Sequence, residues 1–226
     1  IQEHFAPNFE LEYALKEKGK TSESETLNRI RDLANIHFVW QKELNGLGDA
    51  VRYGKTFVGD EPFAVLLGDS ILESNTDTPI LKQMIEKFEE FGSSVTAVRK
   101  VPNNLVSRYG ILSPKPTKYP NFHEVKEWIE KPSPEEAPSD LAVAGAYIFT
   151  PKIFDLLEKT PPGKHNEIQL TDAMHALLKM QKMYALEFDG TRYDIGNKLD
   201  FIKTNLIFGL RNTEFEDELR SWINDL

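Results

Sequence analysis

The sequence has no cysteine among its 226 residues. This absence excludes disulfide bonds and thiolate metal sites, and it suits a reducing compartment. Long apolar runs are also lacking, since none approaches the roughly 20 residues that cross a bilayer. The start, Ile1-Gln2-Glu3-His4, has no signal-peptide character. We therefore expect a soluble, cytoplasmic protein that does not bind membranes.

Positive charge is scarce. Lysine and arginine number 27 against 36 aspartates and glutamates, which gives a net charge of −9. This balance argues against a nucleic-acid partner and against an anionic-membrane surface, although a nucleotide could still bind a local basic spot. The 40% hydrophobic content can bury a sizeable core, and the length fits one large domain or a domain with an appendage.

A glycine-rich phosphate loop is missing as well. An α/β nucleotide-binding protein normally carries such a loop after its first strand, where small residues let backbone N–H groups approach the phosphates. This chain opens instead into a charged helix, as though it were entered partway through a domain. The histidines have no metal-ligand spacing, and we assign none of them catalysis. They are His4, His37, His123, His165 and His175.

Helical and strand patterns alternate through the first hundred residues. We expect helices over 9–15 and from Ser22 to Leu33, then strands at 36–40, 63–67 and 94–99. Helices over 49–58 and from Thr78-Pro79 onward separate these strands. The order strand, helix, strand, helix, strand implies an α/β fold with a parallel sheet and right-handed crossovers.

The second half has more closely spaced strands. Segments 108–112 and 124–129 flank a proline-rich stretch and could form a hairpin-like excursion. A long buried strand is expected at 141–149, followed by a helix from Pro151. Further along we expect a helix over 170–180, a strand over 184–188 and a turn at Asp189-Gly190. The segment Tyr193–Gly196 then precedes a final helix.

Two aspartates stand beside glycine after apolar stretches. If the strand ends that carry Asp69 and Asp194 face one crevice, their carboxylates could hold a Mg²⁺ that keeps water and substrate phosphate as its other ligands. Taken singly, Asp69 could equally be a turn residue and Asp194 a helix cap.

Glu130-Lys131-Pro132 is a second candidate. We expect Pro132 to hold Lys131 in an extended conformation. Glu130 could then accept sugar hydroxyl hydrogen bonds while the ammonium meets a phosphate. A charged pair that ends a surface strand is the alternative.

Several glycines could let a ligand approach the backbone. Gly46 and Gly48 bracket a turn, and the upstream Gln41 offers a donor and an acceptor to the edge of a base. A helix-starting turn with Asp49 as N-cap would explain the same turn without a ligand. Tyr109-Gly110 and Gly145 stand at strand edges where a ligand could lie, or where a bulge could form.

These motifs together resemble those of the bacterial and archaeal UTP–glucose-1-phosphate uridylyltransferases, also called UDP-glucose pyrophosphorylases, among the sugar-phosphate nucleotidyltransferases. Seven ordered segments carry the resemblance: 41–43, 46–51, 59–63, 67–69, 130–132, 167–172 and 193–196. It implies a Rossmann-like mixed, mostly parallel sheet flanked by helices. It also implies that UTP and glucose 1-phosphate react to give UDP-glucose and pyrophosphate, with Mg²⁺ as cofactor and no covalent intermediate.

The resemblance also implies residue roles. Matched by position, one set contacts the nucleotide (Gln41, Gly46 and Gly48), one lines the sugar (Tyr109, Gly110, Glu130 and Gly145), and one is catalytic (Asp69, Lys131 and Asp194). Asp69 and Asp194 would bind the metal, and Lys131 the sugar phosphate. The resemblance further implies one nucleotidyltransferase domain over residues 1–226, with its sugar-binding strands within 106–150.

Three departures from the family pattern stand out. Asp49 stands where the family usually has a histidine, Ser70 stands where it often has a second aspartate, and the expected N-terminal strand and Gly-Thr-Arg loop are missing. We therefore expect an N-terminally incomplete domain whose exposed sheet edges favour a homo-oligomer. Two alternatives remain: a thymidylyltransferase or another hexose-1-phosphate nucleotidyltransferase, and a noncatalytic sugar-nucleotide-binding module.

Overall fold

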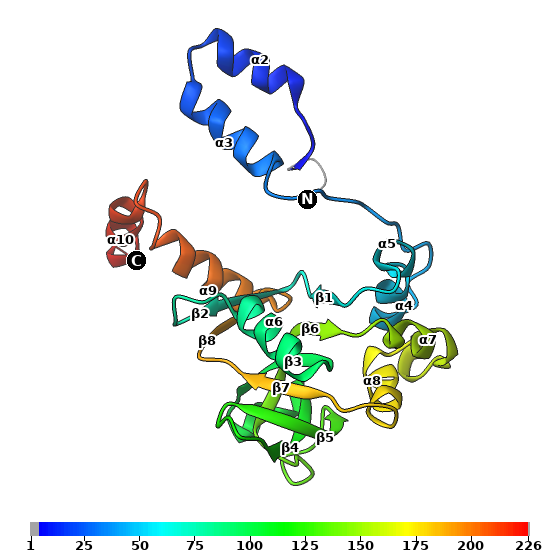
Figure 1. The fold of residues 1–226 in the computed structure, drawn as a ribbon. Helices are drawn as coiled ribbons and strands as arrows, with labels where there is room; N and C mark the ends of the chain where they lie inside the picture. Colours follow the sequence, from blue (N-terminus) through cyan, green and yellow to red (C-terminus); the bar gives the residue numbers. More distant parts are fainter. Residues whose placement is uncertain (1–4, 226) are drawn as a thin grey trace. The chain divides into compact units, whose positions relative to one another are not determined.

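The computed structural model describes residues 5–225, so His4 lies outside the described residues. The chain divides into two compact units, the first ending at Lys42 and the second beginning at Glu43 (Figure 1). In the first unit, α2 (Phe9–Glu17) and α3 (Thr21–Arg31) confirm the two predicted helices. An ion pair of 3.3 Å between Arg31 and Glu12 links them.

The predicted strand at 36–40 is wrong, because residues 34–40 have neither helix nor strand structure. A strand needs a partner for its backbone hydrogen bonds, and no strand is assigned among the described residues of the first unit. Apolar composition alone does not make a strand here.

The second unit is built on a six-stranded sheet in the order β1-β6-β3-β7-β5-β4. Only the pairing of β3 with β7 is parallel, so the sheet is mixed as predicted, but the expectation of a mostly parallel sheet is wrong. The predicted hairpin is confirmed as β4 and β5. The strands are β1 (Phe63–Leu66), β3 (Val95–Lys100), β4 (Gly110–Pro116), β5 (Phe122–Glu130), β6 (Leu141–Phe149) and β7 (Tyr184–Glu187).

Strand β6 divides the core into two layers. Tyr147 and Phe149 pack with α7 and α8 on one face, while Ala146 and Ile148 pack with α6 on the other, as the alternation of side chains along a strand requires. Helices α4, α7 and α8 contact one another, and α6 lies along β3 and β6 (Figure 1). These helices are α4 (Leu47–Arg52), α6 (Ile80–Phe91), α7 (Lys152–Lys159) and α8 (Leu170–Leu178).

Some predicted helices differ in extent from those observed. The segment 49–58 divides at Gly54 into α4 and the short α5 (Lys55–Val58), and the predicted final helix is two helices. These are α9 (Lys198–Gly209) and α10 (Glu216–Asn224), and the 3₁₀ turns are η1 (Asn103–Arg108) and η2 (Lys164–Asn166). Among residues 5–225, no helix is long and apolar enough to cross a membrane.

A separate two-stranded ribbon was not predicted. It consists of β2 (Ser70–Ser74) and β8 (Gly190–Asp194), which run antiparallel. Its register places Ser70 opposite Asp194. The ribbon therefore brings Asp69, which directly precedes β2, next to the end of β8.

Candidate active site

Asp69 and Asp194 converge at the end of the ribbon. The Ile195 N–H donates a 2.9 Å hydrogen bond to the Asp69 carbonyl. A Cβ placed on Gly196 would lie 2.8 Å from Asp69 Oδ2 and 3.4 Å from Asp194 Oδ1, so both carboxylates lie close beside this glycine. Both aspartates also line one cavity of about 340 Å³, together with Arg108, which we call the aspartate cavity.

This arrangement fits a divalent cation held by few protein groups. Two converging carboxylates are the hard oxygen donors that Mg²⁺ prefers, and Mg²⁺ commonly keeps waters or phosphate oxygens at its remaining positions. Within residues 5–225, no group of three or more histidine, aspartate or glutamate side chains could hold a metal. The described residues therefore suit a metal site completed by water or phosphate oxygens more than a structural site made of protein ligands alone.

The four predicted sugar contacts line a second cavity, of about 210 Å³, which we call the sugar cavity after that prediction. Gly110 and Glu130 pair directly across β4 and β5, and a Cβ on Gly110 would lie 3.1 Å from Glu130 Oε2. The absence of a side chain at position 110 thus leaves room for the Glu130 carboxylate. Tyr109 and Gly145 complete the set.

Gly145 lies in a β-bulge, as the alternative interpretation had it. The register between β3 and β6 shifts at this point, and the φ of Gly145 is +84°, a conformation that glycine adopts most readily. Its carbonyl accepts a hydrogen bond from the Leu67 N–H, and a Cβ would stand 3.0 Å from Ser70 Oγ. The bulge therefore brings the backbone of β6 close to the aspartate-bearing turn.

Tyr147, which the sequence motifs did not indicate, also lines this second cavity. Only 6% of its surface is exposed. Burial raises the pKa of its hydroxyl well above the ordinary value, and the negative charges of Glu130 and Asp69 raise it further. The hydroxyl therefore stays protonated and can donate a hydrogen bond. Its place on the same face of β6 as Gly145, two residues away, is the signal that would have found it.

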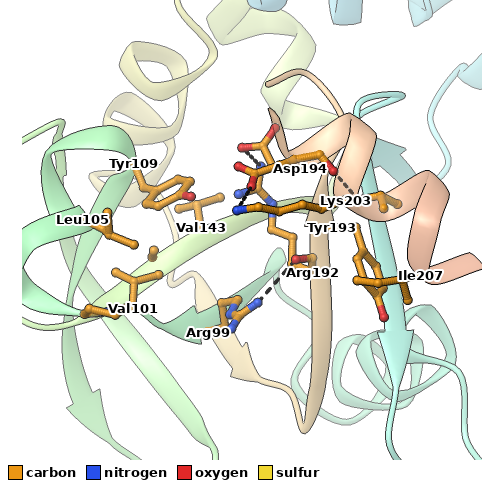
Figure 2. A pocket seen from close by; sticks show the side chains of 14 residues that line it. Arg99, Val101, Leu105, Tyr109, Val143, Arg192, Tyr193, Asp194, Lys203 and Ile207 are labelled. Carbon is orange, nitrogen blue, oxygen red and sulfur yellow. Dashed lines mark hydrogen bonds and ion pairs between the residues drawn. The ribbon is translucent and has the colours of Figure 1, made fainter. Parts of the chain in front are cut away.

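The sequence motifs did not indicate Arg192 either, although it lies two residues before Asp194 and thus on the same face of β8. Its guanidinium carbon is 5.2 Å from the centre of the Tyr109 ring. Figure 2 shows Arg192, Asp194 and Tyr109 around a further cavity of about 290 Å³, which Arg99 and Lys203 also line. Arg192 Nη2 lies 3.5 Å from Asp194 Oδ2 and so forms an ion pair with one of the two converging carboxylates.

Lys131 is not extended, which corrects the expectation from Pro132. Its φ is +50°, in the left-handed region, and its N–H donates a 3.0 Å hydrogen bond to the Tyr109 carbonyl. This hydrogen bond continues the β4–β5 pairing by one step and outweighs the local preference that proline imposes. Lys131 Nζ lies 4.0 Å from Glu130 Oε1, and the residue lines neither the sugar cavity nor the aspartate cavity.

Gly46 and Gly48, at the start of α4, both lie against protein atoms. A Cβ on Gly46 would be 2.7 Å from Glu167 Cβ, and one on Gly48 would be 2.6 Å from the Ile168 carbonyl oxygen. Gly46 is the N-cap of α4, so the expectation of Asp49 as N-cap is wrong. Asp49 is instead fully buried inside the helix, and it forms an ion pair with Arg52.

Gln41 belongs to the first unit, whereas the cavities belong to the second. The predicted contacts of Gln41, Gly46 and Gly48 with a nucleotide therefore stay predictions. In the second unit, the segment after Gly46 does reach the sugar cavity through Leu47.

A mixed sheet, flanking helices and paired carboxylates beside a cavity define a nucleotidyl transferase class of protein, and comparisons with known proteins agree. A family model described as "Nucleotidyl transferase" matches residues 8–208. The curated "UTP--glucose-1-phosphate uridylyltransferase" of Streptococcus pneumoniae serotype 4 is 44% identical over all of this chain and 76% of its own length. The chain therefore belongs to the nucleotidyl transferase family, within its UTP–glucose-1-phosphate uridylyltransferase branch.

Solved structures agree with this assignment. A UDP-glucose pyrophosphorylase complexed with UDP-glucose aligns with a TM-score of 0.83 at 34% identity, over 93% of this chain and 76% of that one. A UTP-bound UGPase from Acinetobacter baumannii aligns with a TM-score of 0.88 at 34% identity, over 100% of this chain and 78% of that one. The resemblance first read from the seven sequence segments is thus confirmed.

Proposed function

We propose that this protein forms UDP-glucose and pyrophosphate from UTP and glucose 1-phosphate. The single observation that carries the proposal is the convergence of Asp69 and Asp194 beside Gly196, next to a cavity lined by Tyr109 and Glu130. The relatives named above support the choice of nucleotide and sugar.

The sugar cavity supplies both hydrogen-bond acceptors and donors. The Glu130 carboxylate can accept hydrogen bonds from sugar hydroxyls, and the protonated Tyr147 hydroxyl can donate one. Lys131 follows Glu130 directly and is the candidate for the sugar phosphate. The turn with Gly46 and Gly48, together with Gln41, is the candidate for the uracil base.

Asp69 and Asp194 are the proposed magnesium ligands. When Mg²⁺ is bound there, it supplies charge neutralisation to the phosphates. The chain's own contribution is to hold the reactants in line, so that a phosphate oxygen of glucose 1-phosphate attacks the α-phosphorus of UTP and pyrophosphate leaves. The ammonium of Lys131 would offset negative charge at the sugar phosphate.

The alternatives differ in measurable ways. A thymidylyltransferase would use dTTP in preference to UTP, and a noncatalytic module would bind UDP-glucose without releasing pyrophosphate. We propose a cytoplasmic location on the grounds given in the sequence analysis. A single domain over residues 1–226 stays a prediction.

Pyrophosphate release by the purified protein tests the proposal. We expect release with UTP, glucose 1-phosphate and Mg²⁺, a lower rate with dTTP or galactose 1-phosphate, and a loss on the order of 100-fold in Asp69→Asn. Asp77→Asn changes an exposed aspartate outside both cavities and serves as the matched control. Pyrophosphate release that is unaffected by Asp69→Asn, or binding of UDP-glucose with no release at all, would overturn the proposal.

A further inference from the structure

Ser70 connects Arg192 to the first of the two carboxylates. Arg192 donates to Ser70 Oγ from both Nε, at 3.3 Å, and Nη2, at 3.0 Å. A serine hydroxyl has two acceptor lone pairs and one proton to donate. Because Arg192 supplies donors to both lone pairs, the hydroxyl proton is directed elsewhere, and Asp69 Oδ1 lies 3.5 Å from Ser70 Oγ.

Arg192 also contacts the second carboxylate directly, since its Nη2 lies 3.5 Å from Asp194 Oδ2. The Arg192 guanidinium therefore contacts Asp194 directly and Asp69 indirectly, through the Ser70 hydroxyl. The side chain is only 13% exposed, which strengthens its electrostatic interactions relative to a surface arginine.

Two further contacts hold this arginine in place. Its guanidinium lies over the Tyr109 ring, and its backbone carbonyl accepts a 3.5 Å hydrogen bond from Arg99 Nη1. Gly145 lies on the other side of Ser70, so close that a Cβ on this glycine would stand 3.0 Å from Ser70 Oγ. Ser70 is thus confined between Arg192 and Gly145, and its hydroxyl has little freedom to turn away from Asp69.

We propose that Arg192 is a positioning residue that sets the separation of Asp69 and Asp194 through Ser70, and so presents both carboxylates to one divalent cation. The inference rests on the proposed function, in which these aspartates bind the metal. Arginine suits this role because its planar fork offers several donors in fixed directions, whereas the lysine ammonium is a point charge on a flexible stem.

Charge and positioning make opposite predictions for metal affinity. A nearby positive charge repels a cation. If Arg192 affected the metal only through its charge, its removal would therefore tighten metal binding. Loss of positioning would weaken it, as substitutions of residues that orient metal ligands do, by about 10-fold or more. The sign of the change therefore separates the two roles.

The test is an electron paramagnetic resonance titration of the full protein with Mn²⁺, without substrates, so that metal binding is read apart from activity. We expect Arg192→Lys, Arg192→Gln and Ser70→Ala each to weaken Mn²⁺ binding by about 10-fold. The double variant Arg192→Lys/Ser70→Ala should bind no more weakly than the single variants, because residues acting through one contact are not additive. Raised Mg²⁺ should restore much of the turnover of Arg192→Lys.

Arg211→Lys is the matched control. Arg211 pairs with Glu73 and Tyr193 on the β2–β8 ribbon and contacts neither metal-site aspartate, so its substitution should leave Mn²⁺ affinity unchanged. Melting temperatures would check that every variant is folded.

Tighter or unchanged Mn²⁺ binding in folded Arg192→Gln, or additive effects in the double variant, would overturn the inference. If the wild-type protein releases pyrophosphate and binds Mn²⁺ while Arg192→Lys behaves identically, only the role of Arg192 fails. If the wild-type protein neither binds Mn²⁺ nor releases pyrophosphate, the proposed function fails with it.

Discussion

Gly196 and Asp69 are so close that no side chain fits between them: a Cβ on Gly196 would stand 2.8 Å from Asp69 Oδ2. The φ of Gly196 is not in the left-handed region, so alanine could adopt its backbone conformation. We predict that Gly196→Ala fills the space between the carboxylates and lowers Mn²⁺ affinity by about 10-fold or more, with a melting temperature close to that of the wild type.

Gly68→Ala is the control for this prediction, because a Cβ at Gly68 meets no atom within 4 Å. It adds the same methyl group to the turn that carries Asp69, in open space. Equal Mn²⁺ affinities for Gly196→Ala and wild type would argue against a metal site between these aspartates.

Glu130 should act on the sugar without acting on the metal. Glu130→Gln keeps the shape of the side chain and removes its charge. Because hydrogen bonds to charged groups contribute about 1.5–3 kcal/mol, we predict a rise of about 10-fold or more in the KM for glucose 1-phosphate. Mn²⁺ affinity should not change, since Glu130 does not line the aspartate cavity. Steady-state kinetics with varied sugar phosphate measure this.

Glu127→Gln, an exposed position on the same strand, is the matched control for Glu130→Gln. A KM unchanged by Glu130→Gln would remove Glu130 from the sugar site.

The candidate residues chosen from the sequence lie together in the structure, whereas the expected sheet differs from the observed one. Asp69, Asp194 and Glu130 come from the matched segments and Gly145 from its position at a strand edge, and the structure brings them to two adjoining cavities. The ribbon of β2 and β8 was missed because its strands are short and pair only with each other, far apart in the chain. Strand formation of that kind depends on the partner and leaves little local pattern.

The wrong expectations have the same origin. The prediction for Lys131 used only its neighbour Pro132, whereas a hydrogen bond to Tyr109 from the facing strand decides its conformation. The predicted strand at 36–40 used only apolar composition and had no strand beside it. Local sequence rules failed where the backbone conformation depends on a contact distant in sequence, or on the lack of one.

Gly48, the second residue of α4, offers a test that separates a packing role from a ligand-binding role. A Cβ on Gly48 would meet the Ile168 carbonyl oxygen at 2.6 Å, and the Gly48 N–H already donates to that oxygen at 2.9 Å. We predict that Gly48→Ala lowers the free energy of unfolding by about 1–3 kcal/mol, because backbone must shift to admit the methyl group. Urea denaturation measures this, again with Gly68→Ala as control. Full stability with weakened UTP binding would instead favour the nucleotide contact.

Self-association remains a prediction from the sequence, and β1 offers a place to test it. Among the described residues, β1 pairs with β6 on one side only, and its Leu66 is 58% exposed. Such an edge can pair with another chain, and a charge placed on it opposes that pairing. We predict that the protein sediments as an oligomer and that Leu66→Lys shifts it towards monomer. Sedimentation of a dilute wild-type sample as a clean monomer would contradict the prediction.

Glu90 should make stability depend on pH at acidic values. The Lys118 ammonium, with the Tyr119 hydroxyl and Lys87, lowers the pKa of Glu90 from 4.5 to about 2. Because the folded-state pKa is depressed, this carboxylate stabilises the fold above its unfolded pKa, and the contribution is lost as the pH falls towards about 2. We predict that Glu90→Gln is less stable than wild type at about pH 6 and that the difference shrinks by about pH 3. Urea midpoints at both pH values measure it. Glu86→Gln, an exposed position on the same helix, is the control variant, and a constant Glu90→Gln difference would refute the role of this ion pair.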